Sequence, residues 1–154
     1  MFGPDDSSPC KGCSFLTDQM PAHLGVLRER NTNYVIVSRA PYDRIAEFQK
    51  RMGWPQLWVS SFESDFNFDF KGTVSEQIKP EEWNWHKFAG KGEQSMFNVF
   101  VRGDDGGIYH SYAAGGRGTD HMLTTLQLLD LTPMGRQHQP GPPGGMLYHD
   151  EIEA

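Results

Sequence analysis

Apolar side chains recur at helical spacing in the first part of the chain. They lie at steps of four, four and three residues, at Leu16, Met20, Leu24 and Leu27. This spacing places them on one face of a helix. Pro21 falls inside the pattern, and proline lacks a backbone N–H and collides with the preceding turn. We therefore expect this helix to be kinked or broken in two.

Two short β-prone runs follow, with an amphipathic segment between them. The runs are residues 34–37 (Tyr-Val-Ile-Val) and 57–60 (Leu-Trp-Val-Ser), both typical of buried strands. The spacing of Ile45, Phe48 and Met52 predicts a helix with one apolar face. This helix is expected over residues 42–52, and Gly53 is suited to end it. A strand, a helix and a strand in this order indicate a parallel right-handed crossover.

The second half of the chain predicts a hairpin. Its strands are residues 96–101 and 108–112, and its five-residue turn is Gly103-Asp104-Asp105-Gly106-Gly107. A short glycine-containing connection favours antiparallel pairing. Residues 62–94 have weak periodicity and are expected to form a structured excursion. Within them, Ser64 and Asp65 are suited to cap a short helix that reaches Phe70.

A last helix is expected from Thr119 or Asp120 to about Asp130. Its inward side chains are predicted to be Met122, Leu123, Leu126 and Leu129. Residues 137–154 contain a Pro/Gly run and indicate a flexible C-terminal tail. The preceding residues 1–136 show no internal break, which is typical of one domain.

The order of these elements predicts an α/β fold. Parallel crossovers followed by an antiparallel hairpin and a closing helix are the layout of the thioredoxin superfamily. The added strand at 57–60 resembles the peroxiredoxin branch. We expect a three-layer sandwich with a mixed central sheet and helices on both faces.

Charge and hydropathy narrow the classes of function. The formal net charge is −6 and the pI is about 5.4, so the basic footprint of a nucleic-acid-binding protein is absent. The sequence has no polybasic stretch for anionic lipids, no run of membrane-spanning length and no secretory signal at its start. We expect a soluble cytoplasmic protein that binds neither nucleic acid nor membrane.

The two cysteines of the chain, Cys10 and Cys13, have C-x-x-C spacing. A structural disulfide rarely persists in a reducing cytosol, and a bridge across two residues restrains little of the unfolded chain. The pair therefore indicates redox chemistry. Two alternatives remain: half of a zinc site, for which His23 is the nearby histidine, or an inherited dithiol without a role. No cofactor and no metal are expected.

Many short stretches together resemble a thioredoxin-like family, domain-of-unknown-function family eight-nine-nine. They are residues 1–5, 10–15, 37–41, 51–54, 60–62, 64–67, 110–112, 117–118 and 129–136, among them Met-Phe-Gly-Pro-Asp, Cys-Lys-Gly-Cys-Ser-Phe and Leu-Asp-Leu-Thr-Pro-Met-Gly-Arg. The family is described as predicted dithiol-disulfide oxidoreductases and has a strand ahead of Met-Phe-Gly-Pro. We expect that strand to be missing or reduced to a stub here. The hairpin begins Gln94-Ser95-Met96, without the proline usual in thioredoxin-like folds.

The resemblance implies a helix that begins at Cys10. Unpaired N–H groups at a helix N-terminus stabilise a thiolate, and Lys11 adds a cation. Cys10 is then the exposed attacking thiol and Cys13 the resolving thiol, one helical turn further on. Because Lys11 favours the reduced form, we expect a potential above roughly −270 mV, less reducing than that of thioredoxin.

Two arginines are candidate supporting residues. Arg39 follows a predicted strand at the edge where α/β folds place their sites, and it could steady a thiolate or a polar substrate. Arg117, ahead of the last helix, is a second candidate. For both, a surface salt bridge is the alternative.

Other polar and aromatic residues have mainly structural interpretations. Asp65 and Asn67 are more suited to capping than to catalysis, and His110 to a hydrogen bond within a strand. A set of aromatic residues either packs the excursion onto the core, which we favour, or lines a peptide groove. The set is Phe66, Phe68, Phe70, Trp83 and Trp85.

The leading hypothesis is a thiol–disulfide oxidoreductase or redox sensor that uses Cys10 and Cys13. Its partner would be a disulfide-bearing protein or a small thiol, and the chain would be a monomer or a homodimer. A thiol peroxidase, with Cys10 peroxidatic and Cys13 resolving, is one alternative. A non-enzymatic module that binds a metal or a protein through both thiols is the other.

Overall fold

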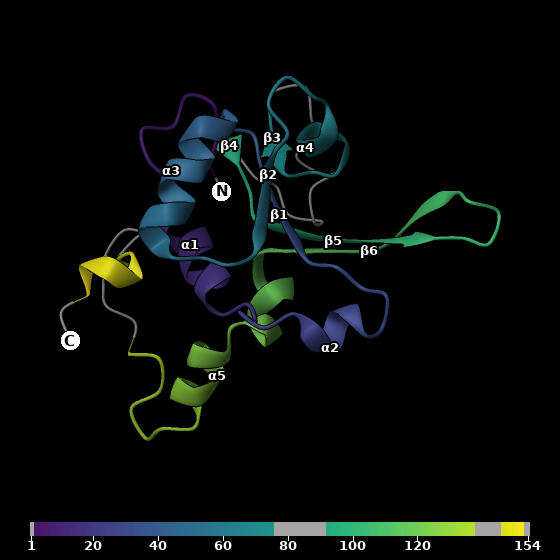
Figure 1. Cartoon of the computed structure of the whole chain (residues 1–154). Helices are drawn as coiled ribbons and strands as arrows, with labels where there is room; N and C mark the ends of the chain where they lie inside the picture. The colour runs from purple at the N-terminus through teal and green to yellow at the C-terminus, as the bar shows by residue number, and fades with distance from the viewer. Residues whose placement is uncertain (1, 76–91, 138–145, 153–154) are drawn as a thin grey trace. The chain divides into compact units, whose positions relative to one another are not determined.

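The computed structural model describes residues 2–75, 92–137 and 146–152. The chain divides into two compact units, and Figure 1 labels their helices and strands. The first unit contains residues 1–64 and 122–154, and the second contains residues 65–121. The sequence predicts a single domain over residues 1–136. Periodicity identifies individual elements, but it does not say which elements cluster together.

The first unit carries a parallel strand pair. Its elements are α1 (Lys11–Asp18), α2 (Gly25–Arg28), β1 (Val35–Ser38), α3 (Tyr42–Met52), β2 (Leu57–Ser60), α5 (Thr124–Asp130) and the 3₁₀ helix η3 (His149–Glu151). β1 and β2 pair in parallel, from Val35 opposite Leu57 to Ser38 opposite Ser60. The predicted strand–helix–strand segment is therefore confirmed. The break expected at Pro21 is confirmed too, because α1 ends before it and α2 begins after it.

The core of the first unit is aromatic. Its buried apolar residues are Phe2, Ala40, Ile45, Phe48, Met52, Trp54, Trp58 and Tyr148. The predicted inner face of α3 is confirmed, since Ile45, Phe48 and Met52 are all buried. Gly53 ends α3 with φ 64°, a left-handed conformation that glycine adopts without strain.

The second unit contains the predicted hairpin. Its elements are α4 (Phe66–Asp69), β3 (Thr73–Val74), β4 (Gly92–Glu93), β5 (Met96–Arg102), β6 (Ile108–Gly115) and the 3₁₀ helix η2 (Gly116–Met122). β5 and β6 pair antiparallel, with an irregularity between Val99 and Phe100. The Phe100 ring packs against Phe66 and Phe70, with centroids 6.2 and 4.8 Å away. Part of the predicted aromatic set therefore packs within this unit, whereas Trp83 and Trp85 lie outside the described residues.

The described strands form three separate two-stranded sheets, β1–β2, β3–β4 and β5–β6. The α/β class is therefore confirmed, but these strands do not join in the single mixed sheet that the sequence predicts. The chain connects β1 to β2 through α3, and it connects β5 to β6 through a tight turn. Joining the pairs would need non-local contacts, which a sequence pattern does not encode.

Two predictions about helix ends are wrong. The last helix is divided into η2 and α5 rather than continuous, and no α5 residue is buried. The side chains predicted to face inward, Met122, Leu123, Leu126 and Leu129, are half-buried, whereas Leu128, outside that set, is 61% exposed. Asp65 precedes α4 but makes no side-chain capping hydrogen bond.

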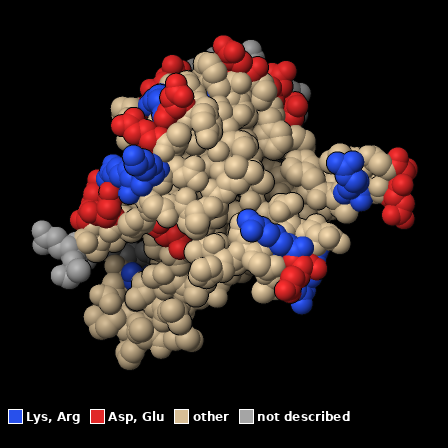
Figure 2. All heavy atoms as spheres, in the orientation of Figure 1, with Lys and Arg blue, Asp and Glu red and all other residues tan. Residues whose placement is uncertain are grey.

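On the face in Figure 2, acidic and basic side chains are interspersed with broad areas that carry neither. Among the described residues, no helix combines the length and apolar content that a bilayer crossing requires.

The core gives a first prediction. Ile45 is fully buried, so Ile45→Ala should lower the free energy of unfolding by about 2–5 kcal/mol through lost burial and a cavity. Leu57→Ala is the control, because Leu57 is 59% exposed and its loss should cost much less. Urea denaturation followed by Trp fluorescence measures both. Equal losses would contradict this description of the core.

Candidate functional site

Cys10 occupies the N-cap of α1. Its backbone is extended (φ −62°, ψ 123°), and its carbonyl accepts the N–H of Ser14 at 3.0 Å, which starts the helix. The Ser14 hydroxyl donates to the same carbonyl at 3.0 Å. The sulfur of Cys10 accepts the backbone N–H of Cys13, with an N–Sγ distance of 3.4 Å. Cys10 thus takes the position that Ser or Asp commonly holds at a helix start.

The two thiols differ in exposure and in acidity. Cys10 is exposed and Cys13 is half-buried, and both are free thiols. A hydrogen bond from the Cys13 side chain, helped by the backbone N–H groups of Cys13 and Gly12, lowers the pKa of Cys10 to about 5. The same hydrogen bond, together with burial, raises the pKa of Cys13 well above its usual value. At neutral pH the pair therefore holds one thiolate, on the exposed sulfur.

Lys11 lies beside the thiolate but is already paired. Its Nζ is 2.7 Å from Oε2 of Glu151 and 5.0 Å from the centre of the Tyr148 ring. The sequence suggests Lys11 as a cation for Cys10, whereas the largest contribution to the lowered pKa of Cys10 is the hydrogen bond from the Cys13 side chain. Its charge is shared with a carboxylate from the C-terminal segment.

The two candidate arginines lie in different units. Arg39 follows β1 directly in the first unit and is half-buried. Arg117 lies in η2, in the second unit, and pairs with Asp120 at 3.0 Å. The Arg117 side chain is 89% exposed, so the surface salt bridge raised as the alternative for it is present. The structure brings Lys11 and the cysteines together on α1.

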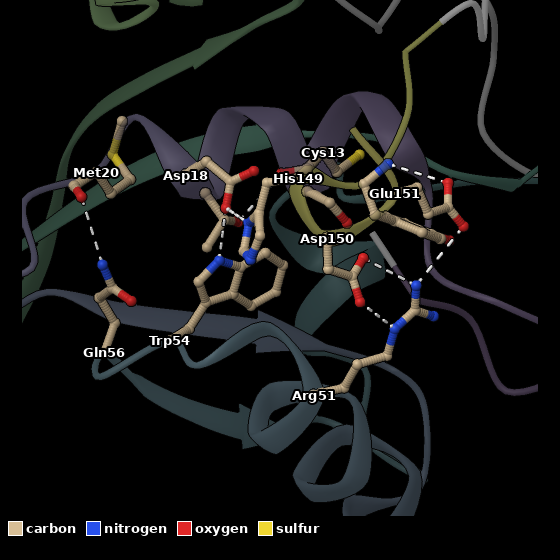
Figure 3. A network of polar contacts seen from close by, with 12 residues as sticks. Cys13, Asp18, Met20, Arg51, Trp54, Gln56, His149, Asp150 and Glu151 are labelled. Carbon is tan, nitrogen blue, oxygen red and sulfur yellow. Dashed lines mark hydrogen bonds and ion pairs between the residues drawn. The ribbon is translucent and has the colours of Figure 1, made fainter. Parts of the chain in front are cut away.

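Sequence reasoning missed the C-terminal segment. Tyr148 is 3% exposed, and its hydroxyl donates a hydrogen bond to the carbonyl of Pro9. Asp150 accepts two hydrogen bonds from Arg51 of α3, at 2.7 and 2.9 Å (Figure 3). The segment expected to be a flexible tail therefore contributes a core residue. A tyrosine between Leu147 and His149, followed by two acidic residues and placed after the Pro/Gly run, was its only sequence signal.

Asp18, at the other end of α1, is also held in place (Figure 3). Its Oδ1 accepts the indole N–H of Trp54 at 2.7 Å and lies 2.7 Å from Nδ1 of His149. The Lys11–Glu151 ion pair holds the start of α1, and the contacts of Asp18 with Trp54 and His149 hold its end. The dithiol helix is thus held by side-chain contacts at both of its ends.

The remaining candidates have structural contacts. Asn67 is buried and donates to Glu93 at 3.1 Å. His110 lies in β6 and hydrogen-bonds Asn98 at 2.9 Å, which confirms the structural interpretation. Within the parts of the chain that the structure covers, no group of three or more His, Cys, Asp or Glu is arranged to hold a metal ion.

Comparison with known proteins tests the family membership that the sequence suggests. A family model described as "Bacterial protein of unknown function (DUF899)" matches residues 1–152. The chain belongs to the DUF899 family. No curated protein and no solved structure is significantly similar to it. The family expected from the sequence is therefore confirmed, and the site of this DUF899 protein has to be interpreted from its own geometry.

The site predicts how the acidity of Cys10 depends on one backbone N–H. Gly12→Pro removes an N–H that stabilises the thiolate, at a helix position that tolerates proline, so the pKa of Cys10 should rise by about 1 pH unit. Gly12→Ala keeps that N–H, and its Cβ would lie 3.9 Å from Sγ of Cys10, an ordinary contact. It should leave the pKa unchanged.

The measurement is the rate of iodoacetamide alkylation against pH. In the parent DUF899 protein, the rate at Cys10 should rise through a midpoint near pH 5 and level off above it.

The depressed pKa also means that ionised Cys10 stabilises the reduced protein. That contribution is complete above the pKa of an unfolded thiol and is lost as the pH falls through about 5. A midpoint near 8.5 would contradict this description of the site.

Proposed function

We propose that this DUF899 protein is a thiol–disulfide oxidoreductase with a thioredoxin-like fold of the peroxiredoxin branch. One observation carries the proposal: the exposed sulfur of Cys10 caps α1 and accepts hydrogen bonds from the N–H and the thiol of Cys13. The order of elements supports the fold, with the dithiol helix followed by a parallel crossover, an antiparallel hairpin and a closing helix.

The chemistry begins with attack by the Cys10 thiolate on one sulfur of a substrate disulfide. A Cys10–substrate disulfide forms, the substrate S–S bond breaks, and the other substrate sulfur leaves as a thiolate. Cys10 then carries no charge, so the hydrogen bond to its thiolate, the largest cause of the raised Cys13 pKa, is lost. The pKa of Cys13 falls, although burial still opposes its ionisation, and its proton passes to solvent. The Cys13 thiolate attacks Cys10, which releases the second substrate thiolate. The substrate gains two electrons and the dithiol becomes a disulfide.

The proposal needs a partner that returns the dithiol to its reduced form. A small thiol or a second dithiol protein supplies the two electrons by the reverse exchange. The substrate is a disulfide-bearing protein or a mixed disulfide of a small thiol. A cytoplasmic location fits the reaction, since that compartment keeps such thiols reduced.

Reduction of insulin disulfides by dithiothreitol, followed by turbidity, tests the activity. The parent protein should accelerate precipitation, and Cys10→Ser should abolish the acceleration because a hydroxyl is not ionised at neutral pH. Cys13→Ser should accumulate a mixed disulfide at Cys10, detectable by intact mass. Ser8→Ala, at an exposed position near Cys10, is the control and should behave as the parent.

Other outcomes would favour the alternative functions. Peroxide-dependent consumption of a thiol reductant without insulin reduction would replace the proposal with a thiol peroxidase. Stoichiometric retention of zinc or copper, again without insulin reduction, would replace it with a metal-binding module.

Stabilisation of the Cys10 thiolate also predicts the redox potential. A stabilised thiolate favours the reduced form, so the potential should lie above the roughly −270 mV of thioredoxin. Equilibration with glutathione buffers, with the dithiol fraction read by alkylation and mass, gives the value. A potential well below that of thioredoxin would contradict the thiolate assignment.

A further inference from the structure

The C-terminal segment holds both sequence neighbours of Cys10. We call residues 148–151 the C-terminal clamp. The Tyr148 hydroxyl donates to the carbonyl of Pro9, which belongs to the same peptide group as the N–H of Cys10. Glu151 binds Lys11, the residue directly after Cys10, at 2.7 Å. The C-terminal segment thus contacts the residues before and after Cys10 across sequence separations of 139 and 140 residues.

The clamp is itself anchored in the first unit. The Tyr148 ring packs edge-on against Phe48, with centroids 5.2 Å apart. Arg51 binds Asp150 through two hydrogen bonds and lies with its guanidinium 5.0 Å from the centre of the Tyr148 ring. The clamp is therefore fixed on its α3 side independently of its contacts with α1.

The charges around the clamp are matched. The ion pair with Lys11 holds the pKa of Glu151 below its usual value, and Arg51 does the same for Asp150. Glu151 also accepts the N–H of Tyr148 at 3.3 Å, which fixes its carboxylate in the clamp. The cation next to Cys10 is thus partly neutralised by a carboxylate with a fixed position.

We propose that the C-terminal clamp is a positioning element of the dithiol, which fixes the peptide group before Cys10 and balances the charge after it. This inference rests on the proposed function. Tyr148 keeps Cys10 in the extended N-cap geometry that lets its sulfur accept N–H groups of α1. Glu151 works in the opposite sense, because its negative charge opposes a thiolate and weakens the effect of Lys11. The clamp therefore sets how much thiolate is present.

The Tyr148 and Glu151 contacts can be removed separately, and the two variants have opposite expected effects on the pKa of Cys10. Tyr148→Phe keeps the buried ring and removes only the hydroxyl, so the freed peptide group should raise the pKa of Cys10 by about 0.5 pH unit. Glu151→Gln removes a charge from an exposed pair, so the pKa of Cys10 should fall by about 0.3 pH unit. Thiolate absorbance at 240 nm, titrated on the full reduced chain and compared with Cys10→Ser, reports both.

Each variant has a matched control. Tyr42→Phe removes a tyrosine hydroxyl at a residue that is 60% exposed, and Glu29→Gln removes a charge from an exposed ion pair with Arg30, outside the clamp. Both controls should keep the parent value. Circular dichroism establishes that each variant is folded. If Tyr148→Phe unfolds, Glu151→Gln, which changes a surface residue, still tests whether the clamp alters the charge beside Cys10.

The outcomes separate the clamp from the proposed function. Opposite shifts of the two variants away from their controls support the clamp. If either folded variant keeps the Cys10 pKa of its control while the parent Cys10 pKa stays near 5, residues 148–151 have only a structural role and the inference fails. A parent Cys10 that titrates like an ordinary thiol overturns the proposed function instead, whatever the variants do.

Discussion

The packing of Phe48 is the contact on which the first unit depends. Its ring meets those of Phe2, Trp54, Trp58 and Tyr148, with centroids 5.2–6.4 Å apart. These rings come from the N-terminal segment, α3 and the residues after it, β2 and the C-terminal segment. Tilted and edge-on aromatic pairs are favourable beyond the area that they bury. One side chain of α3 therefore brings together segments that have no local reason to meet.

The environment of the dithiol follows from this packing. Tyr148 belongs to the aromatic core, and its hydroxyl reaches the peptide group that precedes Cys10. Trp54 belongs to the same core, and its indole N–H holds Asp18 at the far end of α1. The helix that carries both thiols is thus tied to the core at each end. Its N-terminal N–H groups are directed at the Cys10 sulfur without further reorganisation, which is what stabilising a charge requires.

Local signals in the sequence were sufficient for local structure. The spacing within α3 and the glycine after it predicted that helix to the residue, and the glycine-rich turn predicted the hairpin. The C-x-x-C spacing likewise identified the two thiols that meet in the first turn of α1. In each case the deciding contacts lie within a few residues or across one connection. Periodicity and turn chemistry therefore carried enough information.

The contacts that sequence reasoning missed are long-range. Glu151 is 140 residues from Lys11, and Asp150 is 99 residues from Arg51. A three-residue 3₁₀ helix has no periodicity to read. Its location after a Pro/Gly run even favoured a tail.

The separation between the dithiol and its clamp has a consequence during synthesis. A nascent chain that has emerged only as far as β2 already carries Cys10 and Cys13 but contains none of residues 148–151. Until those residues leave the ribosome, the peptide group before Cys10 has no Tyr148 hydroxyl and Lys11 has no Glu151. The surroundings of the dithiol in a growing chain thus differ from those in the folded first unit, and they are complete only after residues 148–151 have been synthesised.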